Sequence, residues 1–141
     1  MATYNSTNIQ NKTGIAAGGP AGNVNVAYAE VVTTAALTTA DFLYFFDLPA
    51  NARVLAATLE ATDMDTNGTP TLALNVGDSG SATRFFSAST VGQAGTASVA
   101  SAVAGLHFKT TAKTRIVCVP SANAATGVAG SVYLSMLYVV E

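Results

Sequence analysis

The amino-acid sequence predicts an all-β fold, a single jelly-roll-like antiparallel β-sandwich of about eight strands. Three observations carry this prediction. Apolar and polar residues alternate over short segments from residue 24 onward, which is the period of half-buried strands. Clusters of turn-forming residues separate these segments at intervals of roughly 10 residues, the spacing of sandwiches and barrels. No segment sustains the 3.6-residue period of an amphipathic helix.

The chain of 141 residues has the length of one domain, and its pattern divides it into two parts. Residues 1–23 are polar, rich in Gly and Ala, and sustain neither period. We therefore expect an extended or flexible N-terminal arm there, without a strand. Fully stretched, about 20 residues span roughly 70 Å, which is enough to reach a neighbouring subunit. Residues 24–141 are expected to form the β-sandwich domain.

The first half of this domain carries the clearest strand patterns. Residues 24–32 alternate regularly and predict the first strand. Residues 41–47 are the most aromatic segment, and aromatic side chains on both faces predict a strand covered by the core on one side and by a partner or a loop on the other. Residues 54–61 and 71–76 alternate on either side of a turn-rich cluster, and a further strand begins at Arg84.

The second half of the domain has weaker patterns. Residues 90–104 are rich in Ala, Ser, Gly and Val and predict either a weak strand near 97–103 or an ordered loop. Two short strands are expected at residues 106–109 and 115–119. A loop of small residues over 121–130 then leads to a long closing strand at 131–141.

Asp63, Asp65 and Asn67 are the candidate metal ligands. Followed by a glycine, they match the first half of a calcium-binding loop, in which oxygen ligands recur at alternate positions. The position of the bidentate glutamate is occupied by Leu74, so the motif is incomplete, although Asp78 from the next turn could contribute. A tight hairpin turn accounts for Asp and Asn at these positions without a metal. We expect a structural turn, and neither a metal nor a cofactor.

The residues available for catalysis are few. His107 is the only histidine and Cys118 the only cysteine, so they form the only conceivable Cys–His pair. Cys118 alternates with core-like residues and is expected to be a small buried hydrophobe, in which a thiol is inert. One Cys and one His cannot complete a tetrahedral zinc site, and no nucleophile elbow or Gly-rich phosphate loop occurs. The sequence predicts a protein that is not an enzyme.

The composition points to association with other proteins. Charged residues make up only 10% of the chain, well under the roughly 25% of an ordinary soluble domain. A surface so poor in charge favours an assembly, and we expect a homotrimer formed through sandwich edges and faces. The formal net charge of -2 argues against a nucleic-acid partner. No apolar stretch reaches the roughly 20 residues of a membrane span, so no membrane contact is expected.

Several stretches of the sequence resemble small structural proteins of tailed-bacteriophage heads. They are residues 48–54 (LPANARV), 63–72 (DMDTNGTPTL), 76–78 (VGD) and the closing loop and strand over 124–140. The resemblance, to capsid decoration (cement) proteins, covers most of the chain from about residue 28 onward. It implies a jelly-roll-like sandwich, often with an extended terminal arm, that binds the outside of the capsid. Such proteins commonly form trimers at three-fold and quasi-three-fold positions.

The same resemblance implies the partner and the location. The partner would be the major capsid protein, and the place would be the outer capsid surface of the virion, after synthesis in the host cytoplasm. The alternative is another phage β-sandwich component, such as a tail, fibre, or host- or carbohydrate-binding module. Carbohydrate binding normally uses exposed Trp or Tyr platforms, and the chain has no Trp.

Overall fold

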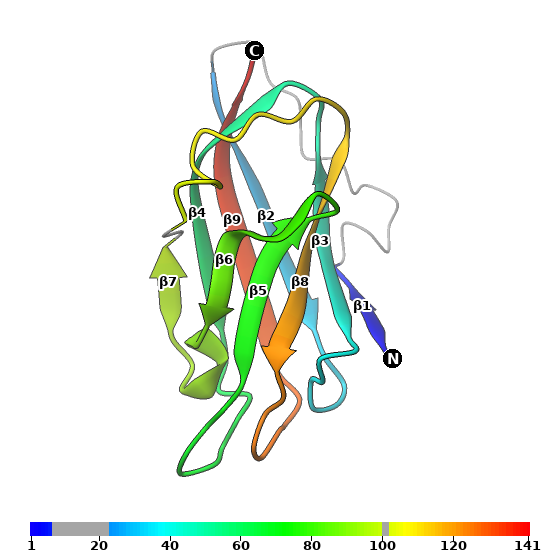
Figure 1. The fold of residues 1–141 in the computed structure, drawn as a ribbon, viewed down its shortest axis with the longest axis vertical. Coiled ribbons are helices and arrows are strands. Elements are labelled where there is room, and N and C mark those ends of the chain that lie inside the picture. The colour runs from blue at the N-terminus through cyan, green and yellow to red at the C-terminus, as the bar shows by residue number, and fades with distance from the viewer. Residues whose placement is uncertain (7–22, 100–101) are drawn as a thin grey trace.

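The computed structural model describes residues 1–6, 23–99 and 102–141, which form an all-β sandwich of two facing sheets (Figure 1). One sheet has the strand order β1-β3-β8-β5-β6 and the other β2-β9-β4-β7. The four-stranded groups 3-8-5-6 and 2-9-4-7 are the two layers of a jelly roll, so the predicted fold class is confirmed. The strands are β1 (Thr3–Asn5), β2 (Val24–Val32), β3 (Phe42–Leu48), β4 (Ala52–Ala61), β5 (Ala73–Asp78), β6 (Ser81–Ser89), β7 (Ala97–Val99), β8 (Thr114–Ala122) and β9 (Ser131–Val140), with a 3-10 turn at Val91–Gln93.

Alternation along the strands turns one set of side chains into the space between the two sheets. In β9 the inward residues Val132, Leu134, Met136 and Tyr138 are at most 1% exposed. Each such side chain contributes about 1.5–3 kcal/mol when it is fully buried. Cys118 of β8 is 0% exposed in the same core, as predicted, and burial raises the pKa of its thiol to about 12.

β9 is a central strand of its sheet. It pairs antiparallel with β2 without a register shift, from Val24↔Val139 to Val32↔Ser131. On its other side it pairs antiparallel with β4, and Figure 1 shows it between these two strands. This sheet is therefore held together by a strand from the second half of the chain that joins two strands from the first half.

The aromatic segment that the sequence analysis singled out forms β3, and aromatic rings lie on both faces of this strand. Its register with β8 shifts between Tyr44 and Phe46, which is a β-bulge. The bulge places Phe45 and Phe46 in the core at successive positions, 0% and 1% exposed. Phe42 and Tyr44 lie half-buried and stack on each other, with ring centroids 6.3 Å apart. A local backbone irregularity therefore explains why the aromatic residues do not alternate.

The strand predicted for residues 106–109 is wrong. His107 has a φ of 64°, a turn conformation, and its N–H donates to a carbonyl of β4. Lys109 meets Arg53 only as an isolated bridge. The apolar signal came from Phe108, which packs against the core from this turn. Elsewhere the differences concern boundaries, since β7 is shorter than expected and β8 extends into the expected loop.

The expectation of an N-terminal arm without a strand is wrong for Thr3–Asn5. This segment forms β1 and pairs parallel to β3. The carboxylate of Asp41 accepts the N–H of Ala2 at 2.7 Å, and the N–H of Phe42 donates to the carbonyl of Ala2 at 3.0 Å. The backbone groups at the edge of β3 recruit this segment, which needs no hydrophobic period to pair. The rest of the expected arm, residues 7–22, lies outside the described residues.

Candidate functional site

The three candidate metal ligands lie in the connection between β4 and β5. Because these strands belong to different sheets, the connection crosses between the layers and is not the tight hairpin that the sequence predicted. Asp65 is 1% exposed, and its carboxylate accepts four backbone N–H groups. The donors are Thr71 (2.7 Å), Leu72 (3.0 Å), Ala125 (2.9 Å) and Thr126 (2.8 Å). Asp65 therefore joins the β4–β5 connection to the β8–β9 connection.

The electrostatics of Asp65 fit this structural role. Burial raises the pKa of its carboxyl group, but the four backbone hydrogen bonds outweigh burial and hold the pKa well below its ordinary value. Asp63 accepts the N–H of Asp65 at 3.2 Å, and Asn67 bonds to Thr69 and Thr126, both at 2.9 Å. The described part of the chain contains no group of three or more His, Cys, Asp and Glu that could hold a metal. A metal-free structural connection stays our prediction.

Asp78, the further oxygen donor considered for that motif, is engaged by Arg84. The guanidinium donates to its carboxylate through Nε at 2.5 Å and Nη2 at 3.2 Å. The N–H groups of Gly80 and Ser81 donate to the same carboxylate at 2.7 and 3.0 Å. Burial raises the pKa of Asp78, and these hydrogen bonds more than compensate and lower it. Arg84 also lies 3.9 Å over the ring of Phe108, so it ties the β5–β6 turn to the turn before β8.

Every Lys and Arg in the described part of the chain is paired with a carboxylate of the same chain. The pairs are Arg84 with Asp78, Arg115 and Lys113 with Asp47, and Arg53 and Lys109 with Glu141. Hydrogen bonds from Arg115 lower the pKa of Asp47, and those from Arg53 and Lys109 lower the pKa of Glu141 to about 2. The part of the chain that the structure describes therefore presents little uncompensated positive charge.

The structure does not assemble a Cys–His pair. His107 is exposed in the turn before β8, whereas Cys118 is fully buried in the core. A thiol with a pKa of about 12 stays protonated at neutral pH and is a poor nucleophile. None of the described residues forms a helix that is long and apolar enough to cross a membrane.

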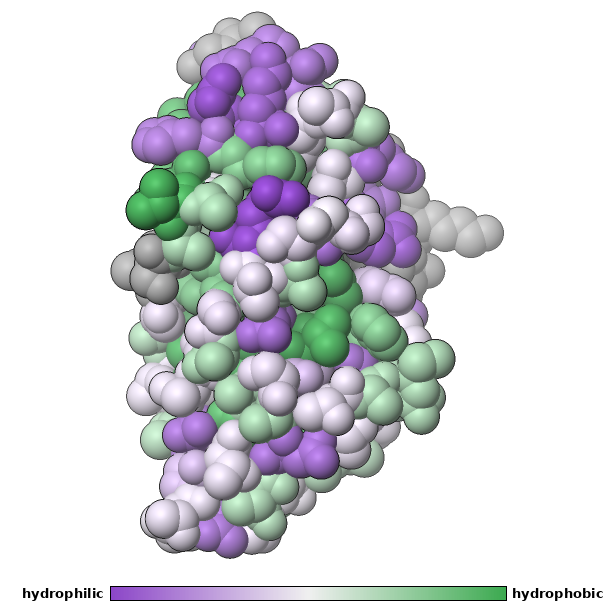
Figure 2. All heavy atoms as spheres, in the orientation of Figure 1, coloured by the Kyte–Doolittle hydropathy of each residue, from purple (hydrophilic) through white to green (hydrophobic). Residues whose placement is uncertain are grey.

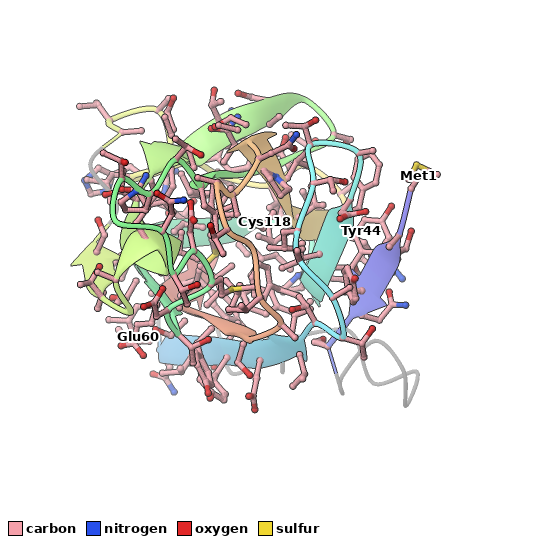
Figure 3. All side chains as sticks on the ribbon, turned by 90° about the horizontal axis from the view of Figure 1, so that it is seen from below. Met1, Tyr44, Glu60 and Cys118 are labelled. Atoms are coloured by element: carbon pink, nitrogen blue, oxygen red, sulfur yellow. The ribbon has the colours of Figure 1, made fainter. Side chains whose placement is uncertain are left out.

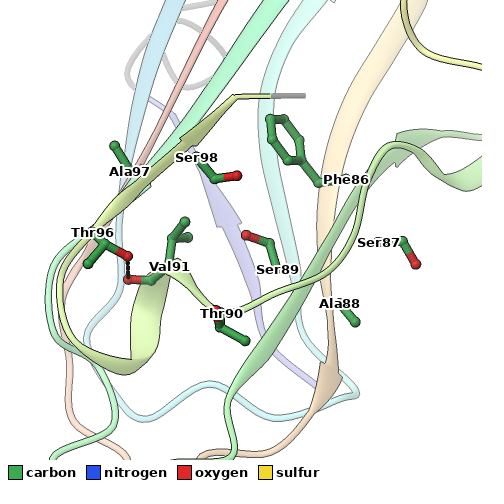
Figure 4. A pocket seen from close by; sticks show the side chains of 9 residues that line it. All are labelled: Phe86, Ser87, Ala88, Ser89, Thr90, Val91, Thr96, Ala97 and Ser98. Atoms are coloured by element: carbon green, nitrogen blue, oxygen red, sulfur yellow. Dashed lines mark hydrogen bonds between the residues drawn. The ribbon is translucent and has the colours of Figure 1, made fainter. Parts of the chain in front are cut away.

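A cleft of ≈340 Å³ opens between β6 and β7, which are edge strands of the two sheets (Figure 4). Hydroxyl groups dominate its lining, from Ser87, Ser89, Thr90, Thr96 and Ser98. The hydroxyl of Thr96 donates to the carbonyl of Val91 at 3.4 Å. Because no lining residue carries a titratable side chain, the cleft offers hydrogen bonds but no acid–base or metal chemistry.

Exposed apolar side chains gather on the outer face of the β2-β9-β4-β7 sheet. We call five of them the β2 stripe, which consists of Val24, Val26, Tyr28 and Val32 of β2 and Leu137 of β9, exposed by 40–60%. Figure 3 shows β2 along one border of the sandwich, with side chains directed away from it. The opposite sheet, seen in Figure 2, has a mixed surface whose hydrophilic atoms gather toward the end that carries the C-terminus.

The sequence contained the signal for the β2 stripe without revealing its exposure. Residues 24–32 alternate, but both faces of this strand are apolar, so the pattern does not show which one is buried. In the structure the small side chains of Ala27, Ala29 and Val31 face the core, at most 3% exposed. Val24, Val26, Tyr28 and Val32 face solvent.

Comparison with known proteins identifies relatives among solved structures, whereas no protein-family model and no curated protein matches. A chain of the cyanophage Pam1 capsid asymmetric unit is 47% identical, with a TM-score of 0.80, over 89% of this chain and 90% of that chain. A chain of the capsid of Ralstonia phage GP4 is 28% identical, with a TM-score of 0.84, over 99% and 98%. A chain of the acidic stable capsid structure of Helicobacter pylori bacteriophage KHP30 is 18% identical, with a TM-score of 0.61 over 85% and 90%, and shows a likeness of fold alone.

The matches to the Pam1 and GP4 chains agree with the β-sandwich fold described above. The similarity to the Pam1 chain extends over most of both chains, so it covers the whole architecture and not one motif. The resemblance to phage head proteins is confirmed at this level. The chain belongs to a family of phage capsid-associated proteins.

Proposed function

We propose that this chain is a decoration protein that binds the outer surface of a phage capsid as a homotrimer and stabilises it. The observation that carries the proposal is the match to a chain of the Pam1 capsid at 47% identity over most of both chains. A non-enzymatic, structural role accords with a cysteine and a histidine that the fold keeps in different environments.

The hydrophobic core of this chain supports a role as a subunit that is added to an already assembled capsid. Two sheets of this one chain enclose a single cluster of buried hydrophobic side chains. The domain therefore has the core that it needs to fold alone and then dock onto an existing lattice. A protein that binds only the mature arrangement of the capsid shell shifts the equilibrium of the shell toward that arrangement by mass action.

The paired charges indicate what kind of contact the docking uses. The described Lys and Arg residues are paired within the chain, so their attraction to carboxylates of the capsid contributes little to attachment. Apolar and neutral polar contacts depend weakly on ionic strength. Attachment to the major capsid protein should therefore persist at high salt.

The trimer adds strength to each attachment. Three linked binding sites can exceed the affinity of one site by about 10²–10⁴-fold when the geometry allows simultaneous contact. We assign residues 24–141 to the body of each subunit and residues 1–23 to the arm that the sequence predicts, except that Thr3–Asn5 pairs with β3 of its own chain and so does not reach a neighbour.

The test is to add the purified protein to capsids that lack it and to image the particles by electron microscopy. The expected result is new density outside the shell at three-fold and quasi-three-fold positions, and particles that resist heating better than bare capsids. Density within the shell, or binding only to tails or fibres, would refute the decoration role. The second of these outcomes would support the alternative of a tail, fibre or host-binding component.

A further inference from the structure

The pair Asn67-Gly68 has a chemistry that the structural role of its connection does not use. An asparagine side chain can cyclise onto the backbone nitrogen of the next residue. Glycine hinders this attack least, because it has no β-carbon and the widest choice of backbone conformations. Of all the asparagines in the chain, only Asn67 precedes a glycine. The sequence therefore singles out one position for this reaction.

The structure leaves the attacking nitrogen free. Gly68 is exposed, and no atom lies within 4 Å of the place that a β-carbon would take there. Its N–H donates no hydrogen bond to any residue that the structure describes. Asn75 offers the contrast, because the next residue is Val76, which has a branched side chain and pairs with β8 inside the sheet. The backbone at Gly68 can therefore adopt the geometry of attack, whereas that at Val76 is held in a ladder.

Two hydrogen bonds at the surface hold the side chain of Asn67. Its Nδ2 donates to the hydroxyl of Thr126 at 2.9 Å, and its Oδ1 accepts the N–H of Thr69 at the same distance. Thr69 and Thr126 are exposed, so water competes for both bonds and each contributes little net stability. Local opening of these bonds brings the amide carbon within reach of the Gly68 nitrogen.

We propose that Asn67 is a site of spontaneous deamidation. The nitrogen of Gly68 attacks Cγ of Asn67, the C–N bond of the side-chain amide breaks, and the proton of the attacking nitrogen leaves with the departing ammonia as a succinimide ring closes. Water then adds to either carbonyl of this ring, which opens to give aspartate or isoaspartate in place of Asn67. The sum is amide plus water to carboxylate plus ammonium, so the reaction requires no oxidant, reductant or cofactor.

The two products differ in what they do to this connection. Aspartate keeps the backbone and an oxygen in the place of Oδ1, so it still accepts the N–H of Thr69. Isoaspartate routes the backbone through the former side chain and lengthens it by one carbon, so this bond is lost. Both products add a negative charge in the same connection as Asp63 and Asp65, and each described Lys and Arg is already paired with a different carboxylate. Isoaspartate should therefore loosen the connection more than aspartate.

The first test follows the purified wild-type protein during incubation at neutral and at mildly alkaline pH, by peptide mapping with mass spectrometry and an enzymatic assay for isoaspartate. Deamidation should be concentrated at Asn67 and should accelerate with pH, because the attacking nitrogen must lose its proton. Asn123 is the internal control, since it lies exposed in the β8–β9 connection and is followed by alanine. Asn67 reacting no faster than Asn123 overturns the inference.

Gly68→Ala tests the role of the glycine. The position is open and its φ lies outside the left-handed region, so the variant should keep the fold. Its β-carbon hinders the attack, so we expect deamidation at Asn67 to slow roughly 10-fold or more, a barrier higher by about 1.4 kcal/mol. Equal rates in G68A and wild type overturn the inference. If G68A fails to fold, the comparison of Asn67 with Asn123 within the wild-type protein still decides it.

The aged protein also reports on the connection. Chromatography separates the unmodified, aspartate and isoaspartate forms, and Asn67→Asp supplies the aspartate form directly. N67D should melt close to the wild type, whereas the isoaspartate form should melt about 2–6 °C lower, as expected for one lost hydrogen bond. An isoaspartate form that melts together with N67D contradicts the effect assigned to the bond with Thr69.

These measurements use the free protein and need no capsid. Failure to decorate capsids contradicts the proposed function and leaves the deamidation site standing, whereas an Asn67 that stays intact contradicts this inference alone. The two failures are therefore distinguishable.

Discussion

Replacing Arg84 by methionine should lower the free energy of unfolding by about 3.5–4 kcal/mol. Removing one partner of a buried ion pair typically costs about 3–5 kcal/mol. The lower end applies because the Arg84 side chain is 19% exposed and two backbone N–H groups remain on Asp78. Loss of the contact with Phe108 adds about 0.5–1 kcal/mol. Methionine keeps most of the apolar stem, so the loss reports mainly on the guanidinium.

Equilibrium unfolding in urea at pH 7 measures this loss, at one fixed protein concentration because association also stabilises the fold. The loss corresponds to a Tm lower by roughly 7–16 °C. Asp78→Asn completes a double-mutant cycle. Without Arg84 the carboxylate is a buried charge that lacks its counter-ion, so D78N should cost much less in the R84M protein than in the wild type. We expect a coupling free energy of about 1.5 kcal/mol or more.

Arg53→Met is the matched control for this cycle. It makes the same chemical change at a pair with Glu141 in which both side chains are more than a third exposed, where screening by solvent leaves little stabilisation. Equal losses for R84M and R53M, or simple additivity of R84M and D78N, would refute the assignment of a stabilising role to the buried pair.

Three further predictions follow from the site. The pKa values of five carboxyl groups are lowered in the folded protein, those of Asp41, Asp47, Asp65, Asp78 and Glu141. Their contribution to stability is therefore complete above the unfolded pKa values near 4 and is lost as the pH falls through the lower folded values. The Tm from thermal melts should be level from about pH 7 to 5 and fall below about pH 4, and a Tm unchanged at pH 2 would contradict this. EDTA should leave the Tm unchanged, because the Asp65 oxygens already accept four backbone N–H groups, whereas a loss restored by calcium would show that the 63–68 segment binds metal. Deletion of residues 1–22 should leave the sandwich folded, because β1 adds only three residues to one edge. The truncated protein should occupy fewer sites than the intact protein when each is mixed with undecorated capsids, whereas unchanged occupancy and particle stability would leave attachment to the sandwich alone.

Period and turn chemistry were sufficient to predict the fold class and most of the strands. The alternation in residues 24–32 and 54–61 identified β2 and β4, and that in 131–141 identified β9. In β9 one face lies against the core, so its hydrophobic period reflects a real difference in burial, whereas both faces of β2 are apolar and only one of them is buried. Where a turn presents an apolar side chain to the core, as Phe108 does, a local alternation arises without a strand.

Long-range contacts were beyond the reach of local patterns. The Asp63 to Asn67 segment has the composition of a hairpin turn, and only the placement of β4 and β5 in different sheets shows that it crosses between layers. The donors to Asp65 at Ala125 and Thr126 are far away in sequence. The exposure of Val26 depends likewise on which face of β2 packs inward, and both faces of that strand are apolar.

The position of β9 between β2 and β4 determines when the protein can fold during its synthesis. β2 and β4 leave the ribosome long before residues 131–140 are translated, and until then neither has the strand that joins them. Such distant pairing is slow to form, and the nascent chain keeps its apolar residues accessible to chaperones and proteases in the meantime. A stalled or truncated polypeptide that lacks β9 cannot build the β2-β9-β4-β7 sheet. Completion of this sheet therefore requires that translation has passed residue 140.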